Sequence, residues 1–250
     1  MSFFLSLMHV SVARARQYPF DFLMSIFEGA SLFLINYLFF SLTTTSSTDT
    51  LLLVAVYQLF NGIFYGLFID NITGLKYYIN QGDMDWMILK PVDAQFYLSF
   101  RYINFGHLIS ALFSIPLFIW IESNYTLSIT FINFLLFLIF LILSIINAYN
   151  LLMTCTALSM LYSDSGNISG IVMPVIQLAK YPKRMYSSKL LPFLLVLLPS
   201  LVTVNMAKDA LLGQWSFLEL SISVLVSVLL CILNRKLFFK AIDQYIGTGS

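Results

Sequence analysis

Residues 128–152 read SITFINFLLFLIFLILSIINAYNLL, and they lie within a longer run, Ser123–Ser163, that carries no charge. A helix needs about 20 mostly apolar residues to cross the hydrocarbon core of a bilayer, so this run predicts a membrane-spanning helix that continues past the bilayer. Over the 250 residues, 59% are hydrophobic and 10% are charged, whereas about 25% are charged in an ordinary soluble domain. We therefore expect an all-α polytopic membrane protein.

Six apolar stretches are long enough, or nearly so, to be transmembrane helices. They lie at about Phe20–Leu42, Leu51–Ile69, Phe105–Ile121, Ser128–Leu152, Leu191–Met206 and Ser216–Leu233. A further uncharged segment, residues 165–179, is short and contains Pro174. Its pattern leaves two alternatives open, an interfacial helix on the cytoplasmic side or a shallow re-entrant segment.

The basic residues predict the orientation of these spans. With six spans and an internal N-terminus, every Lys and Arg except Lys208 falls on one face, including those between Lys180 and Lys189. Cytoplasmic loops carry the excess of basic residues in membrane proteins. We therefore expect a multi-pass protein of the cytoplasmic (inner) membrane with both termini in the cytoplasm and short outer connections.

Residues 1–18 are expected to form a helix that lies in the membrane interface. Their apolar side chains recur near one helical face, and Arg14 and Arg16 stand at the membrane edge, a pattern typical of interfacial helices. The alternative is a frayed terminus.

Residues 71–90, between the second and third spans, are expected to form an amphipathic cytoplasmic helix. Ile72, Leu75 and Trp86 belong to an apolar series at helical spacing, and Pro91 would end the helix. Tethered to two spans, such a helix could receive force from a soluble partner through its apolar and acidic side chains. The alternative is a surface helix that only covers the bundle.

The end of this segment resembles a known family motif. The run Gly82-Asp83-Met84-Asp85-Trp86-Met87-Ile88-Leu89-Lys90-Pro91-Val92-Asp93, followed by Gln95-Phe96, is similar to the Gly-x-Leu-Asp-x-x-Leu-Leu-Lys-Pro segment of a bacterial branch of the ABC type-2 exporter permeases, formerly catalogued as a domain of unknown function. The run Gln177-Leu178-Ala179-Lys180-Tyr181-Pro182 resembles that family's small-basic-Tyr-Pro turn, and Phe238–Tyr245 resembles its C-terminal pattern. Met84 replaces the usual leucine and Lys180 the usual arginine.

This resemblance implies that residues 1–250 form a single permease domain, which exports a drug, peptide or lipid-like compound across a bacterial cytoplasmic membrane. The implied partners are membrane lipid, a second permease, identical or homologous, and two copies of a nucleotide-binding ATPase subunit that holds ATP and Mg²⁺. Residues 71–90 would be the coupling helix seated on that ATPase. The implied coupling residues are Gly82, Asp83, Asp85, Trp86, Lys90 and Pro91. Neither the cargo nor the identity of the second permease follows from the resemblance.

The chain itself lacks the motifs of several other classes. No phosphate-binding loop ending in Gly-Lys-Ser/Thr is present, and the two histidines form no cluster with metal-ligand spacing. We therefore expect no catalytic residue, metal or cofactor in this chain, and a net charge of +1 gives no reason to expect nucleic acid. The alternative function is a secondary transporter or channel without an ATPase, but the internal repeats or buried charges typical of transporters are not found.

Polar residues inside the spans are candidates for a cargo path. They are Gln58, Asn61, Gly62, Gly66, Asn147, Asn150 and Thr154. The alternative is helix packing, in which small residues allow close approach and amides bond across helices for about 0.6–2 kcal/mol each, and this is favoured for any single residue. Glu28, deep in the first span, is a candidate buried charge that could bind a cation or relay a proton.

Overall fold

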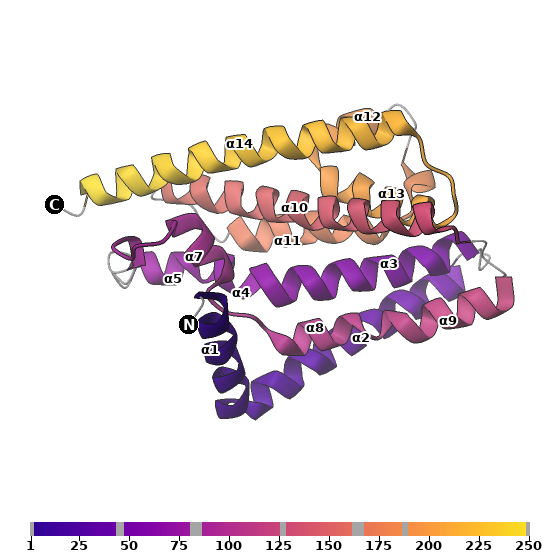
Figure 1. Cartoon of the computed structure of the whole chain (residues 1–250), viewed down its shortest axis with the longest axis horizontal. Coiled ribbons are helices and arrows are strands. Elements are labelled where there is room, and N and C mark those ends of the chain that lie inside the picture. Colours follow the sequence, from indigo (N-terminus) through magenta and orange to yellow (C-terminus); the bar gives the residue numbers. More distant parts are fainter. Residues whose placement is uncertain are drawn as a thin grey trace.

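Helices make up the regular secondary structure that the computed structural model describes, which confirms the all-α prediction. The described residues are 3–43, 48–80, 87–125, 129–161, 168–186 and 190–248. The long helices run side by side in an elongated bundle (Figure 1). We name its two ends the Asp49 end and the Asp70 end, after the first turn of α3 and the start of α4.

Within the described residues, five helices are long and apolar enough to cross a membrane. They are Pro19–Leu42, Thr48–Thr73, Phe105–Tyr125, Phe131–Leu161 and Phe217–Gln244, and they correspond to five of the six predicted spans. Helix α10 (Phe131–Leu161) has 31 residues and is about 46 Å long at 1.5 Å per residue. It therefore continues past a hydrocarbon core of about 30 Å, as its uncharged sequence indicated. The C-terminal helix α14 (Phe217–Thr248) is equally long.

Two of the five spans are interrupted. One consists of α3 (Thr48–Phe64), the π-helix η1 (Tyr65–Ile69) and α4 (Asp70–Thr73), and the other of α8 (Phe105–Ala111) and α9 (Ser114–Tyr125). The carbonyl of Gly66, within η1, accepts a hydrogen bond from the amide of Asn104 at 2.8 Å, so the π-turn is tied to the chain entering α8. The break before α9 precedes Pro116, which has no amide hydrogen to bond to the preceding turn.

Shorter helices gather at the Asp70 end. They are α1 (Phe3–Gln17), α5 (Leu75–Asn80) and α7 (Ala94–Phe100). Helix α1 agrees with a helical segment at residues 1–18, while its place in the membrane interface remains a prediction. The helix predicted over 71–90 is represented by α4 and α5, which Gly74 separates. Residues 81–86 lie outside the described residues.

The predicted span Leu191–Met206 is wrong. The structure divides it into α12 (Leu191–Leu197) and α13 (Pro199–Leu211), because Leu198 leaves the helical region at φ −133° and ψ 62°. Pro199 begins the second helix, where its missing amide hydrogen does no harm. The 13 residues of α13 reach only about 20 Å, which is too short for a span.

Instead, the chain passes from the Asp70 end to the Asp49 end through the segment that the sequence left ambiguous. Three elements follow α10: α11 (Ile168–Gln177), η2 (Leu178–Lys180) and η3 (Lys183–Met185). The ring of Tyr181 lies 6.1 Å from that of Phe40, near the end of α2 (Pro19–Thr43). The ammonium of Lys183 forms an ion pair with Asp209 in α13.

These contacts correct the predicted distribution of basic residues. Lys183 and Arg184 line the same hollow as Asp49 and Lys208, so their placement on the opposite face from Lys208 is wrong. Hydropathy missed this because α11 and η2 together are shorter than a standard span. The bias of basic residues toward the Asp70 end is therefore weaker than the sequence suggested.

Thiol labelling tests the corrected topology. In a background with both natural cysteines replaced by serine, Arg184→Cys is expected to react from the same side of the membrane as Ser123→Cys, at the end of α9. Lys236→Cys in α14 is expected to react only from the other side. Labelling with an impermeant maleimide on intact and opened cells measures the side, and reaction of Arg184→Cys together with Lys236→Cys would refute the corrected topology.

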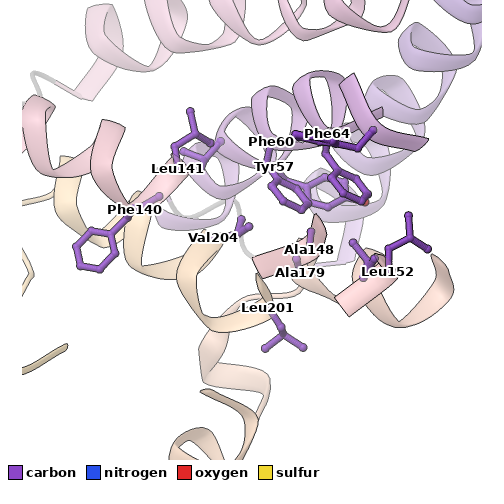
Figure 2. Packing of buried hydrophobic residues seen from close by; sticks show 14 of the residues in the cluster. Tyr57, Phe60, Phe64, Phe140, Leu141, Ala148, Leu152, Ala179, Leu201 and Val204 are labelled. Carbon is purple, nitrogen blue, oxygen red and sulfur yellow. The ribbon is translucent and has the colours of Figure 1, made fainter. Parts of the chain in front are cut away.

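The core lies between α3, α10 and α13. Figure 2 shows Tyr57, Phe60 and Phe64 of α3 close to the apolar side chains of α10 and of η2. The rings of Phe60 and Phe64 are stacked, with 5.9 Å between centroids. All of α13 is buried. Because α13 is enclosed, any charge that it carries needs a partner inside the protein.

The first and second spans differ sharply in burial. In the most apolar window of each span, 83% of the residues are buried for Thr48–Thr73 but only 17% for Pro19–Leu42. The central span is thus covered by its own chain, whereas α2 presents apolar side chains such as Phe27 outward. That surface requires lipid or another subunit as its neighbour.

Candidate coupling and cargo sites

Only part of the predicted coupling motif can be placed. Gly82, Asp83, Asp85 and Trp86 lie outside the described residues, so their roles remain predictions. The ammonium of Lys90 lies 2.6 Å from the hydroxyl of Tyr97 in α7 and 4.1 Å from the centroid of its ring. Pro91 is exposed. Lys90 therefore holds the end of the motif against α7.

Asp93, immediately after the motif, connects this segment to α14. Its carboxylate accepts two hydrogen bonds from the guanidinium of Arg235, one of them at 2.8 Å from Nη1 to Oδ1. It also caps α7 by accepting a bond from the amide of Phe96 at 2.9 Å. The hydrogen bond from Arg235 holds the pKa of the Asp93 carboxyl below its ordinary value of 3.8. We call the Asp93–Arg235 pair the clamp.

Tyr149 connects the same segment to α10. Its hydroxyl lies 2.8 Å from the hydroxyl of Ser99 and accepts a bond from the side-chain amide of Gln95 at 3.1 Å. Both partners are on α7. Asn71 in α4 donates to the carbonyl of Tyr102 at 2.7 Å and accepts from its amide at 2.9 Å. Residues 90–104 are thus fixed to three spans at the Asp70 end.

The first half of the predicted cargo path is used for helix packing. The side-chain amide of Gln58 donates to the carbonyl of Ser110 at 2.8 Å. A Cβ added to Gly62 would lie 2.7 Å from Cβ of Ala111, and one added to Gly66 would lie 2.7 Å from Leu108. These contacts favour the packing alternative, because they bring α3 and η1 directly against α8.

The second half of the predicted cargo path contains residues with and without polar partners. Asn150 donates to the sulfur of Cys231 at 3.1 Å and accepts from Asn234 at 2.9 Å, so it joins α10 to α14. Thr154 is half-buried and Asn61 is buried. Asn147 is fully buried, and neither polar atom of its side chain has a partner among the described residues. A role in cargo transfer remains a prediction for these residues.

A row of polar side chains crosses four elements, and of its members sequence analysis singled out only Glu28. Gln177 of α11 donates to the hydroxyl of Tyr65 at 3.1 Å. The Tyr65 ring lies 5.4 Å from that of His107 in α8, and His107 Nε2 lies 4.0 Å from Glu28 Oε2 in α2. We call these four residues the polar row.

Glu28 is not buried by its own chain, because its side chain is 57% exposed. It stands three residues from the middle of α2, or about 5 Å at 1.5 Å per residue. A carboxylate facing hydrocarbon at that depth is costly. The side chain therefore favours a location beside water or another subunit rather than lipid.

Four charges form a closed cluster at the Asp49 end. Lys208 and Asp209 of α13 are each 2% exposed and lie 2.7 Å apart. Lys208 also pairs with Asp49 in α3, and Asp209 with Lys183. Burial alone would lower the pKa of the Lys183 ammonium, but the bond to Asp209 raises it above 10.5. The cluster locks α13 to α3 and η3.

The arrangement is that of a membrane bundle with a clamped segment at one end, and the sequence family agrees with it. The family model described as ABC-2 family transporter protein matches residues 24–249. The chain belongs to the ABC-2 transporter family. Neither the curated proteins nor the solved structures yielded a match.

Membership in the ABC-2 family confirms the resemblance carried by the motifs. Membrane components of this family usually are non-catalytic transmembrane subunits and typically pair with an ATPase subunit. No group of three or more His, Cys, Asp or Glu in the described part of this ABC-2 protein could hold a metal ion.

The sequence contained a weak signal for the clamp of the ABC-2 protein. Asp93 follows the motif directly, and Arg235 stands at the end of the last span. Opposite charges at the same membrane boundary can meet, but their separation of 142 residues offers many other pairings. Tyr149 and the other three members of the polar row carried no signal distinct from ordinary apolar spans, whereas Glu28 stood out as a charge deep in the first span.

Proposed function

We propose that the chain is the permease subunit of an ATP-driven exporter, which moves a drug, peptide or lipid-like compound across the bacterial cytoplasmic membrane. ATP and Mg²⁺ would be bound and used by a separate ATPase subunit. The observation that supports this most is the anchoring of the segment after the coupling motif to α10 and α14. A loop that only covered the bundle would not need bonds to both helices.

In this mechanism the residues around Trp86 sit in a groove of the ATPase. Movement of that subunit pulls on the segment, and the clamp and Tyr149 pass the displacement to α14 and α10. Because α10 packs along α13 and α14 (Figure 1), the displacement changes how these helices meet. Cargo is driven only if its affinity differs between the inward-open and outward-open states.

The complete transporter in this proposal has two permeases and two ATPase subunits, with both termini of each permease in the cytoplasm. Helix α1 and the last turns of α14 lie at the same end of the bundle (Figure 1), as this orientation needs. The exposed face of α2 is the best candidate to meet the second permease, because it is the least covered span. The polar row lies beside that face and is a better candidate for the cargo path than Gln58, Gly62 and Gly66.

The coupling assignment predicts an effect of substitutions in the motif. Trp86→Ala, or Asp83→Lys with Asp85→Lys, is expected to weaken copurification of the ATPase and to uncouple transport, because it removes an apolar anchor or reverses docking charges. Membrane insertion should not change. Pull-down of a tagged chain from native membranes measures the loss.

Trp120→Ala is the matched control, because Trp120 is an exposed tryptophan on α9, outside residues 71–90. Copurification and transport equal to the wild type in both motif variants would reject the coupling assignment. A secondary transporter, the alternative function, predicts that no ATPase copurifies with any of these chains.

A further inference from the structure

An open cavity of about 60 Å³ lies at the Asp70 end between α1, α2, α4 and the start of α8. Its polar lining includes Ser11, Arg14, Tyr18, Asp21, Asp70 and Asn104. That space holds about four waters at about 15 Å³ each, so it suits a small polar group rather than a whole drug-sized molecule. None of these residues belongs to the coupling motif, residues 82–91, or to the polar row.

The charges in this cavity are opposite in sign but do not pair with each other. Arg14 brings a guanidinium, and Asp21 and Asp70 bring carboxylates. Among the residues that the structure describes, no ion pair joins Arg14 to either aspartate. Arg14 instead stacks on the ring of Tyr102 at 5.0 Å, and Asp70 accepts a bond from Asn104 at 3.1 Å. The cavity thus offers a cation and two anions to a ligand that carries both signs.

The cavity lies at the level of lipid headgroups. Asp21 is the third residue of α2, Asp70 stands near the end of the span Thr48–Thr73, and Asn104 immediately precedes the span that starts at Phe105. Three span ends therefore meet around it. Helix α1 leaves the bundle at an angle to α2 (Figure 1), and both helices contribute to the lining of the cavity.

The walls of the cavity are fixed by close contacts. A Cβ added to Gly106 of α8 would lie 2.0 Å from Ser25 Oγ in α2, so these helices touch along one wall. The hydroxyl of Ser11 in α1 accepts a bond from the amide of Ile103 at 3.0 Å. The site is therefore formed before any ligand enters, which lowers the cost of binding.

We propose that this cavity binds the headgroup of a phosphatidylethanolamine-type lipid. The phosphodiester lies against Arg14, whose fork of donors suits phosphate, and the primary ammonium donates to Asp21 and Asp70. The acyl chains pack against Phe20 and Leu23 in the first turns of α2, which leaves the exposed face from Phe27 onward to the second permease. A choline headgroup has no N–H donor and so cannot satisfy the two carboxylates. This assignment does not depend on the proposed ATP-driven function.

Lipid retention tests the proposal. The full-length chain is purified in detergent, exchanged into nanodiscs containing equal amounts of phosphatidylethanolamine and phosphatidylcholine, and extracted again for native mass spectrometry. The wild type is expected to retain phosphatidylethanolamine about tenfold over phosphatidylcholine, which corresponds to one charged hydrogen-bonding site. Asp21→Asn should abolish this preference, and Arg14→Gln should reduce retention of both lipids. Arg16→Gln, on the same helix but outside this cavity, should behave as the wild type.

Two further arms make the result decisive. Asp21→Glu keeps the carboxylate and should restore the preference, which separates a binding defect from a folding defect. Competition with glycerophosphoethanolamine, which has the same headgroup without acyl chains, should not displace the lipid at equal concentration. Equal retention of both lipids by the wild type, an unchanged preference in Asp21→Asn, or full displacement by the soluble headgroup would overturn the proposal.

Discussion

Replacing Lys208 with methionine is expected to lower the free energy of unfolding by about 3–5 kcal/mol, the usual cost of removing one partner from a buried ion pair. Lys208 neutralises Asp209 and Asp49 at the same time, and both Lys208 and Asp209 are almost completely enclosed. For a chain of this size, such a loss lowers the melting temperature by on the order of 10 °C. Size-exclusion chromatography of the detergent-solubilised protein after heating to a series of temperatures measures this shift in melting temperature.

The paired variant separates charge imbalance from lost packing. Lys208→Met with Asp209→Leu removes both enclosed charges, and Lys183, which is 40% exposed, can then turn to water. This double variant is expected to be clearly more stable than Lys208→Met alone. Lys236→Met, an exposed lysine in α14, serves as the control and should have no effect. A melting temperature of Lys208→Met equal to that of the wild type would show that the cluster does not hold α13 in place.

Reversing either charge of the clamp is expected to impair coupling more than folding. Arg235→Asp or Asp93→Arg replaces attraction by repulsion at the junction of the coupling segment and α14. An exposed pair of this kind contributes about 1 kcal/mol, so its loss lowers the equilibrium constant for docking of the segment about fivefold. Transport per ATP hydrolysed by the permease–ATPase complex should fall accordingly, while membrane insertion stays normal.

The charge swap provides the control for this experiment. Asp93→Arg combined with Arg235→Asp restores an attractive pair and should recover much of the coupling, although aspartate is then absent from the cap of α7. If both single variants show the same transport per ATP hydrolysed as the wild type, force does not pass through the clamp.

The clamp also predicts a pH dependence. The pKa of Asp93 is lowered in the folded protein, so the stabilisation that it provides is fully present above its ordinary value of 3.8. The stabilisation is lost as the pH falls through the lower pKa of the folded state. The wild type should therefore lose this stabilisation only under strongly acidic conditions. Asp93→Asn lacks the titrating carboxyl and should not show that loss, and melting curves at several pH values measure the difference.

Hydropathy predicted the long spans because few backbone structures are possible in lipid. A backbone in hydrocarbon must satisfy its own hydrogen bonds, so 20 apolar residues in a row predict one helix. The same reasoning failed at residues 191–206. Leu198 and Pro199 divide this run into α12, whose Phe193 and Val196 are exposed, and α13, which is buried inside the protein. Hydropathy does not distinguish a protein interior from lipid. Sequence analysis placed Lys208 outside the spans, and its neutralisation by Asp209 and Asp49 within the protein is visible only in three dimensions.

The candidate sites were predictable to a smaller extent. The motif around Trp86 predicted a coupling segment through family resemblance, but the residues that tie the chain after this motif to the bundle, Arg235 and Tyr149, are distant in sequence. Gln58 and Asn150 show a second limit, because sequence analysis left both cargo binding and helix packing open for them. A polar side chain in a span is equally compatible with cargo binding and with a bond to a neighbouring helix, and the structure supplies that neighbour for both.

The most direct test of the account is to ask what touches the coupling motif in the cell. A photoactivatable benzoylphenylalanine placed at Trp86 is expected to crosslink, in native membranes, to a polypeptide that contains a phosphate-binding loop. The same probe at Leu218, near the Asp49 end of α14, should not capture that polypeptide. If Trp86 captures only lipid while the chain is normally expressed and inserted, the bundle is not driven through this segment by a separate ATPase.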